Sequence, residues 1–265
     1  MPSVMTTIDV EDQTVEELVV ALAGGCTELV ISGSQPYVAP WYSTVAPYCA
    51  VLESNVLARL AVDTYFQPLT RQASVFCGDI THVFERCPAL EFAYVIGAAE
   101  ISHLDHAALE ELTIMADPTS PSTITAIIGG RAPRLAKLAL GFSYEHGTAA
   151  EADAAFVAAL AAPGLPALTE LHLAYPHDSV AVFERLARSP LFARLEVLSI
   201  EGNFFDEEDR GLAALRAASL ANLREIYLPI RDVMELTDDD LSREFPAIRS
   251  TEDLDVFSPS RYRPD

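Results

Sequence analysis

Three potential metal ligands lie within four residues in the segment His103-Leu104-Asp105-His106. Imidazole nitrogens and carboxylate oxygens bind zinc, but a zinc site needs three or four ligands in a fixed geometry. The segment supplies His103 and His106, with Asp105 as a further oxygen ligand, and its spacing to other ligand residues suggests no partner. We therefore predict no metal site and interpret the segment as an exposed loop that precedes a strand.

Other residues capable of catalysis are isolated along the chain. Glu145-His146 form one pair, and His172 and His177 lie five residues apart. The sequence contains neither the Gly-x-Ser-x-Gly motif of a nucleophilic serine nor a phosphate-binding loop. We therefore expect a protein that is not an enzyme, with no catalytic residue and no cofactor. An enzyme with a loop-borne site, using His172, His177 or the Asp105-His106 pair, is the less favoured alternative.

The cysteines and the acidic runs do not indicate a site either. Cys77 and Cys87 lie ten residues apart, which is neither a zinc-binding nor a redox spacing, and the four cysteines form no disulfide framework. This cysteine usage favours a reducing cytoplasm. The acidic runs at 206–209 and 238–240 lack the spacing of a calcium-binding loop and are typical of solvated helix starts.

Composition and charge exclude several classes of protein. Half of the 265 residues are hydrophobic, so the formal net charge of −22 does not indicate a disordered chain. No apolar run approaches the ~18 to 20 residues of a membrane-spanning helix, and the start has no secretory signal. The negative charge argues against nucleic acid as a ligand and favours a basic protein partner. Sixteen Arg against one Lys, with abundant Ala, suggest a bacterial source with a high-GC genome.

The pattern that must position any site is a repeat of the form Leu-x-x-Leu-x-Leu. Successive clear copies begin 26, 33, 27 and 28 residues apart, at Leu109, Leu135, Leu168, Leu195 and Leu223. Weaker copies begin upstream at Cys26, Leu57 and Leu90. The last four residues of each copy alternate as a half-buried strand does, and Ala-rich amphipathic stretches at 151–162, 179–188 and 206–218 predict helices between the strands.

A strand and a helix every 26 to 28 residues resemble the leucine-rich repeat in its ribonuclease-inhibitor-like form. The segment from Leu195 to Phe204 matches that repeat best, and Asn203 occupies the position of the family's asparagine ladder. The other copies lack this Asn, so we expect irregular loops after most strands. The resemblance implies an α/β leucine-rich-repeat solenoid, a curved arc with a parallel sheet on its concave face and helices on its convex face. The segment 78–81 is also similar to that of small bacterial leucine-rich-repeat proteins without assigned activity.

We expect one domain over residues 1–265. Residues 1–86 would form irregular N-terminal repeats and a cap that includes a helix at 14–23. The clear repeats occupy 87–230, and 231–265 would form an acidic C-terminal cap and tail. Residues 201–265 hold sixteen acidic residues against eight Arg, which makes this end the most acidic part.

Alternate strand residues would point away from the leucines and form columns exposed on the concave face. The first column would hold Phe92, Glu111, Lys137, Glu170, Val197 and Glu225. The next would hold Tyr94, Thr113, Ala139, His172, Ser199 and Tyr227, and the third Ile96, Met115, Gly141, Ala174, Glu201 and Pro229. These columns and the adjoining loops are rich in aromatic side chains, which are enriched in the cores of protein interfaces.

The sequence therefore predicts a non-enzymatic protein-binding module, an adaptor, inhibitor or immunity-type protein. The predicted partner-binding residues are Tyr65, Phe92, Tyr94, Tyr144, Glu170, His172, Tyr175, Glu201, Glu225 and Tyr227. The competing interpretation of these residues is that some aromatic side chains fold inward and cover the irregular loops. A structural subunit of a larger assembly is the alternative function, and the oligomeric state stays open.

Overall fold

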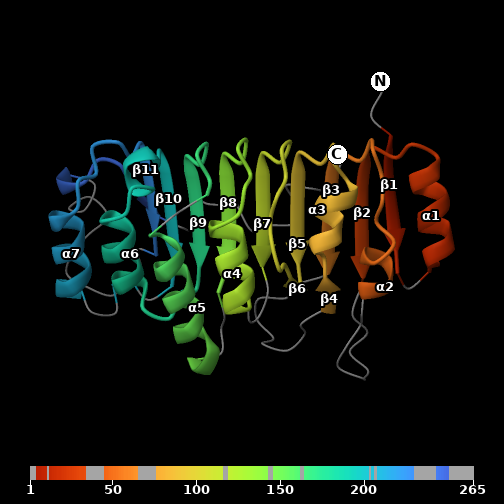
Figure 1. Cartoon of the computed structure of the whole chain (residues 1–265). Helices are drawn as coiled ribbons and strands as arrows, with labels where there is room; N and C mark the ends of the chain where they lie inside the picture. The colour runs from red at the N-terminus through yellow and green to blue at the C-terminus, as the bar shows by residue number, and fades with distance from the viewer. Residues whose placement is uncertain are drawn as a thin grey trace.

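The computed structural model describes residues 4–10, 12–33, 45–64, 76–115, 119–142, 146–161, 164–202, 204–205, 208–229 and 243–250. Its main element is a ten-stranded parallel sheet in which the strands follow one another in chain order (Figure 1). These strands are β1 (Met5–Asp9), β2 (Glu28–Gly33), β3 (Arg59–Thr64), β5 (Phe92–Ile96), β7 (Glu111–Met115), β8 (Lys137–Gly141), β9 (Glu170–Ala174), β10 (Val197–Glu201), β11 (Glu225–Leu228) and β12 (Ile248–Ser250). Two further strands, β4 (Phe76–Asp79) and β6 (Ala98–Glu100), form a small separate sheet.

Helices cover one face of the main sheet, as Figure 1 shows. They are α1 (Val15–Ala23), α2 (Ala46–Cys49), α3 (Thr81–Arg86), α4 (Pro121–Ile128), α5 (His146–Ala159), α6 (Ser179–Ala187) and α7 (Glu208–Ala217), with a 3-10 turn η1 (Phe192–Arg194). We call the opposite face of the sheet the helix-free face. None of the helices in the described part of the chain has the length and apolar character needed to cross a bilayer.

The leucine triplets lie in neighbouring parallel strands, as the repeat predicts. Leu112 pairs with Leu138, Leu138 with Leu171, and the row continues through Leu198 and Ile226. All five side chains are fully buried between the sheet and the helices. We call one strand together with the segment that leads to the next strand a coil. Each row of leucines therefore spans several coils, and one coil does not bury it alone.

Main-chain hydrogen bonds at the start of each strand repeat from coil to coil. The N–H groups of Ala136 and Lys137 both donate to the Glu110 carbonyl, at 2.9 and 3.1 Å. The two x residues that follow the first leucine occupy these donor positions in every clear copy. The same double donation joins Glu110 and Glu111 to Glu91, Thr169 and Glu170 to Ala136, Glu196 and Val197 to Thr169, and Arg224 and Glu225 to Glu196. Because these bonds involve only the main chain, they hold the strands in register whatever the x residues are.

Both ends of the sheet extend beyond the strands that the triplets predict. β1 precedes the first weak copy, and β12 lies in the segment 231–265, where we expected a cap and a tail.

The predicted N-terminal helix is present as α1, and Thr14 and Glu17 form a reciprocal capping box at its start. Thr14 Oγ1 accepts the Glu17 N–H, and the Glu17 carboxylate accepts the Thr14 N–H.

The prediction that the columns of the helix-free face are exposed is wrong for most of that face. Tyr94 and His172 are 0% exposed, and Ser199, Ala139 and Thr113 beside them are also buried. Apolar side chains that alternate onto this face pack against one another. They form a second apolar cluster of Ala61, Phe92, Tyr94, Ile96, Met115 and Ala174. The aromatic side chains of Phe92 and Tyr94 thus belong to the interior of the protein.

Close approach between coils requires glycine at position 164. The Gly164 N–H donates to the Ile128 carbonyl at 2.9 Å, and a Cβ at Gly164 would overlap the Gly130 carbonyl oxygen. We predict that Gly164→Ala lowers the free energy of unfolding by about 2 kcal/mol or more, measured by urea denaturation. Gly24→Ala is the matched control, because the nearest atom to its new Cβ is 3.3 Å away, and it should shift stability by less than about 0.5 kcal/mol. Equal effects of the two substitutions would contradict this packing.

Candidate functional site

The residues at the start of each strand form a row on the helix-free face, and most of them are accessible. We call this the first row. Strand register places its members side by side in the order Met5, Glu28, Arg59, Phe92, Glu111, Lys137, Glu170, Val197 and Glu225. Met5 and Arg59 are exposed, and the four glutamates and Lys137 are half-buried. Seven of the nine members of the first row are therefore at least partly accessible, whereas Phe92 and Val197 are buried.

A cluster of three charged or titratable side chains lies in the middle of the first row. Glu170 Oε1 is 2.7 Å from Lys137 Nζ on the neighbouring strand and 2.7 Å from His172 Nε2 on its own strand. Residues 170 and 172 share a face because side chains alternate along a strand. Burial, the largest single effect, raises the pKa of Glu170, but the hydrogen bonds and charges of His172 and Lys137 outweigh it and lower the pKa to about 2. Glu170 is therefore a carboxylate at any physiological pH.

A small open hollow lies at the N-terminal end of the first row. The Arg59 guanidinium stacks 4.5 Å from the centre of the Phe92 ring, which is a cation–π contact. The residues that line the hollow are Met5, Glu28, Leu29, Val30, Arg59, Leu60, Ala61 and Phe92. This part of the row therefore offers an apolar floor with one anion and one cation beside it.

The opposite end of the helix-free face carries two further carboxylates. Tyr227 Oη donates a hydrogen bond to Glu225 Oε2 at 3.0 Å, so the tyrosine holds this carboxylate in place. Burial raises the pKa of Glu201, at the end of β10, to about 7. Glu201 therefore changes charge near neutral pH, whereas Glu170 does not.

The residues predicted to bind a partner fall into three groups. Phe92, Tyr94 and His172 are buried, with exposed fractions of 6%, 0% and 0%. The half-buried residues are Glu170, Tyr175, Glu201, Glu225 and Tyr227. Tyr65 and Tyr144 lie outside the described residues. The structure brings Glu170 together with His172 and Glu225 together with Tyr227, all on strands β9 and β11.

Sequence reasoning missed the part of the first row that lies upstream of Phe92. Glu28 and Arg59 precede the clear repeats and pair in register with each other and with Phe92. The weak copies that begin at Cys26 and Leu57 carried the signal, because their second x residues are these two.

The histidine segment that first suggested a metal site serves the fold instead. His106 is buried, its Nε2 lies 3.0 Å from the Cys87 carbonyl oxygen, and its Nδ1 accepts the Leu109 N–H at 3.0 Å. In the equivalent turn before Leu135, the Leu135 N–H donates to the main-chain carbonyl of Ala132. At Leu109, the imidazole of His106 takes the place of this main-chain acceptor. Among the described residues, no group of three or more His, Cys, Asp or Glu could hold a metal ion.

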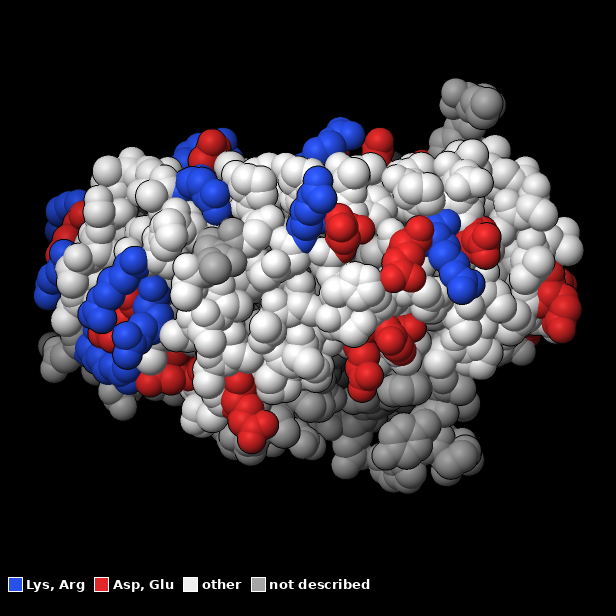
Figure 2. Space-filling model, in the orientation of Figure 1, with Lys and Arg blue, Asp and Glu red and all other residues white. Residues whose placement is uncertain are grey.

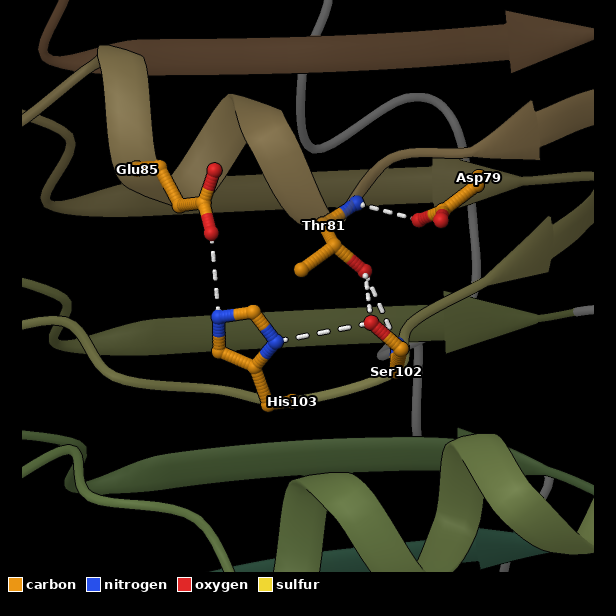
Figure 3. A network of polar contacts seen from close by, with 5 residues as sticks. All are labelled: Asp79, Thr81, Glu85, Ser102 and His103. Carbon is orange, nitrogen blue, oxygen red and sulfur yellow. Dashed lines mark hydrogen bonds and ion pairs between the residues drawn. The ribbon is translucent and has the colours of Figure 1, made fainter.

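His103 belongs to an exposed polar network on the helix-covered side (Figure 3). Its Nε2 is 3.0 Å from Glu85 Oε1 on α3, and its Nδ1 is 3.4 Å from Ser102 Oγ. Ser102 Oγ in turn lies 3.1 Å from Thr81 Oγ1. The order carboxylate, imidazole, hydroxyl is that of an acyl-transfer triad, but about half of the His103 and Glu85 side chains is exposed, and water screens them. The network ties α3 to the segment after β6.

Asp79 completes this network at the start of α3. Its Oδ1 accepts the Thr81 N–H at 2.9 Å. The side-chain and main-chain hydrogen bonds of Thr81 are the main cause that lowers the pKa of Asp79. The carboxylate therefore stays charged where it anchors the first turn of the helix.

Comparison with known proteins concerns the fold alone. No protein-family model matches the chain, and no curated protein sequence matches it. Among solved structures, the chain is similar to a Bacteroides fragilis protein whose crystal structure was determined by the Northeast Structural Genomics Consortium. The TM-score is 0.66 at 16% sequence identity, and the match covers 90% of this chain and 70% of that chain. The large parallel sheet with helices is therefore shared with a protein of very different sequence.

The raised pKa of Glu201 predicts a pH-dependent stability. Between its ordinary value of 4.5 and about 7, the folded protein keeps a proton that the unfolded chain loses, so stability falls as the pH rises. We predict that Glu201→Gln raises the free energy of unfolding at pH 8 by about 1 to 2 kcal/mol, after allowing for partial exposure, and changes it little at pH 4.5. Urea unfolding at both pH values measures this. Glu196→Gln, at an exposed carboxylate before the same strand, should shift both values equally; parallel behaviour of the two variants would refute the assignment.

Proposed function

We propose that the protein is a leucine-rich-repeat solenoid that binds another protein along the first row of its helix-free face, as a non-enzymatic adaptor, inhibitor or immunity-type protein. The repeated double donation at the start of each strand supports the solenoid. It recurs in every clear coil at the same two positions of the motif. Each coil then adds one side chain to the first row at a spacing of about 4.8 Å.

The single observation that carries this proposal is the contrast in exposure between the rows. Tyr94 and His172 in the middle of the face are closed to a partner, whereas Arg59, Glu111 and Glu225 in the first row are accessible. A sheet holds the main chain of these residues at fixed positions, so little main-chain entropy is lost when they bind.

The charge of the first row favours a basic partner. The glutamates Glu28, Glu111, Glu170 and Glu225 outnumber the cations Arg59 and Lys137, and Lys137 is already paired with Glu170. Acidic residues attract a basic partner at long range, and this attraction raises the association rate. Of the predicted contact residues, we retain Glu170, Tyr175, Glu201, Glu225 and Tyr227. We assign Phe92, Tyr94 and His172, which are buried, a supporting role in the packing of the helix-free face.

A charge-neutralised variant tests this proposal. The variant combines Glu28→Gln, Glu111→Gln and Glu225→Gln in one protein. We predict that it no longer captures a basic partner that the unaltered protein captures from its native host at low salt. Affinity capture with mass spectrometry measures the loss, and capture by the unaltered protein should fall between 50 and 200 mM salt.

The matched control removes three charges elsewhere, by Glu53→Gln, Glu151→Gln and Glu184→Gln, and should keep the partner. Thermal unfolding confirms that both variants fold. Equal loss in the two variants, or an acidic partner that resists salt, would refute the proposal. If the unaltered protein instead self-associates in light scattering across a concentration range, the alternative of a structural subunit gains support.

A further inference from the structure

We propose that the outer edge of β1 is a second binding site, which takes an extended, basic and partly apolar segment of a partner protein as an additional strand of the sheet. This site lies at the N-terminal end of the molecule and uses main-chain groups, so it is separate from the side chains of the first row that the proposed function uses.

The main chain of β1 is open on its outer side. In the described part of the chain, β1 pairs with β2 and with no other strand, and it is the last strand at this end of the sheet. The Val4 carbonyl accepts from Thr27 and Glu28, and the Val10 N–H donates to Ser32, so even-numbered residues direct their main-chain groups toward β2. Odd-numbered residues must then point outward, because these groups alternate along a strand of a parallel sheet.

A turn closes only one end of this outer edge. The Asp9 N–H donates to Gln13 Oε1 at 2.9 Å, and the Asp9 carbonyl accepts the N–H groups of Asp12 and Gln13. Within the described residues, no local turn of this kind supplies a hydrogen-bond partner for the outward N–H and C=O groups of Met5 and Thr7. A strand edge with open donors and acceptors is a template for pairing with another chain, and proteins that do not use such an edge cover it or charge it.

Aliphatic side chains are exposed at the same end of the molecule. The exposed fractions are 46% for Val4, 40% for Met5, 46% for Val19 and 71% for Val20. Val4 and Met5 lie at the start of β1, and Val19 and Val20 lie on α1, which stands beyond β1 in Figure 1. Terminal coils of a solenoid normally present a polar outer surface. Exposed valines at this end are therefore better explained by contact with a partner than by capping.

Charge decides which partner fits this end. The first 33 residues contain six Asp and Glu and no Lys or Arg. Figure 2 shows the same bias, because the end that α1 forms carries acidic side chains and no basic ones. A second copy of this chain would bring like charges together, whereas Lys and Arg on an added strand would lie near Asp9, Glu16 and Glu17. We therefore commit to a basic strand from another protein as the occupant.

A designed peptide tests the site directly. The probe is a synthetic peptide of about ten residues in which valine alternates with lysine. The matched control has proline in place of each valine, which keeps the charge and prevents strand pairing. We expect the valine peptide to bind at least about tenfold more tightly than the proline peptide, by fluorescence anisotropy at 150 mM salt, and to slow amide hydrogen exchange in residues 5–9.

Variants of the protein separate strand addition from general attraction. Thr7→Pro removes an outward N–H without breaking the hydrogen bonds to β2, so this variant should fold. Its affinity for the valine peptide should be at least about tenfold lower than that of the unaltered protein. Thr7→Val keeps that N–H and should bind as the unaltered protein does. The variant with Glu28→Gln, Glu111→Gln and Glu225→Gln should bind this peptide within about threefold of the unaltered protein, although it abolishes binding along the first row.

Several outcomes would overturn this inference. They are equal binding of the valine and proline peptides, protection from exchange outside residues 5–9, or unchanged affinity in Thr7→Pro. A dimer of the unaltered protein in sedimentation that Thr7→Pro abolishes would show that a second copy occupies the edge and would also overturn it. Because the first-row variant is assayed in parallel, failure here leaves the proposed function standing, and the reverse holds as well.

Discussion

One strand and its following segment cannot bury their own leucines, and the rest of the structure depends on this constraint. Leu138 is fully buried because Leu112 and Leu171 flank it in register on the two neighbouring strands. The double main-chain donation at the start of each strand sets that register independently of the x residues. Burial and register therefore reinforce each other along the sheet, and stability belongs to adjacent coils together.

The same constraint determines where function can reside. Helices cover the leucine side of the sheet, so most strand side chains that remain accessible lie on the helix-free face (Figure 1). On the helix-free face, Tyr94 and His172 are buried and the first row remains accessible. At the N-terminal end of the described sheet, β1 pairs with β2 alone, and the described residues supply no partner for the outward main-chain groups of Met5 and Thr7. The edge of β1 and the half-buried charges of the first row are the two surfaces that we propose for binding.

The leucine spacing was sufficient to predict the strands from β7 to β11 and their order, because each clear triplet needs the next one to bury its side chains. It could not predict β1 or β12, because Met5–Asp9 and Ile248–Ser250 carry no triplet, although Ile8 and Ile248 are buried in the core. Alternation correctly assigned Tyr94 and His172 to the side away from the leucines. It could not predict their burial, because a period of two gives the side of the sheet and not what packs there. The role of His106 depends on a hydrogen bond to Leu109 that composition does not reveal.

The most direct test of the account is a pair of distances measured along the first row by pulsed electron spin resonance. Spin labels at Glu28→Cys and Glu225→Cys should be separated by seven strand spacings, roughly 34 Å between Cα atoms, and labels at Glu111→Cys and Glu225→Cys by four spacings, roughly 19 Å. The four native cysteines are buried, so the unaltered protein under the same labelling conditions gives the background. Two narrow distributions in a ratio near seven to four would support coils stacked in chain order. The account would be contradicted if the labels at 111 and 225 were farther apart than those at 28 and 225. Two distances that do not scale with the number of strand spacings would also contradict it.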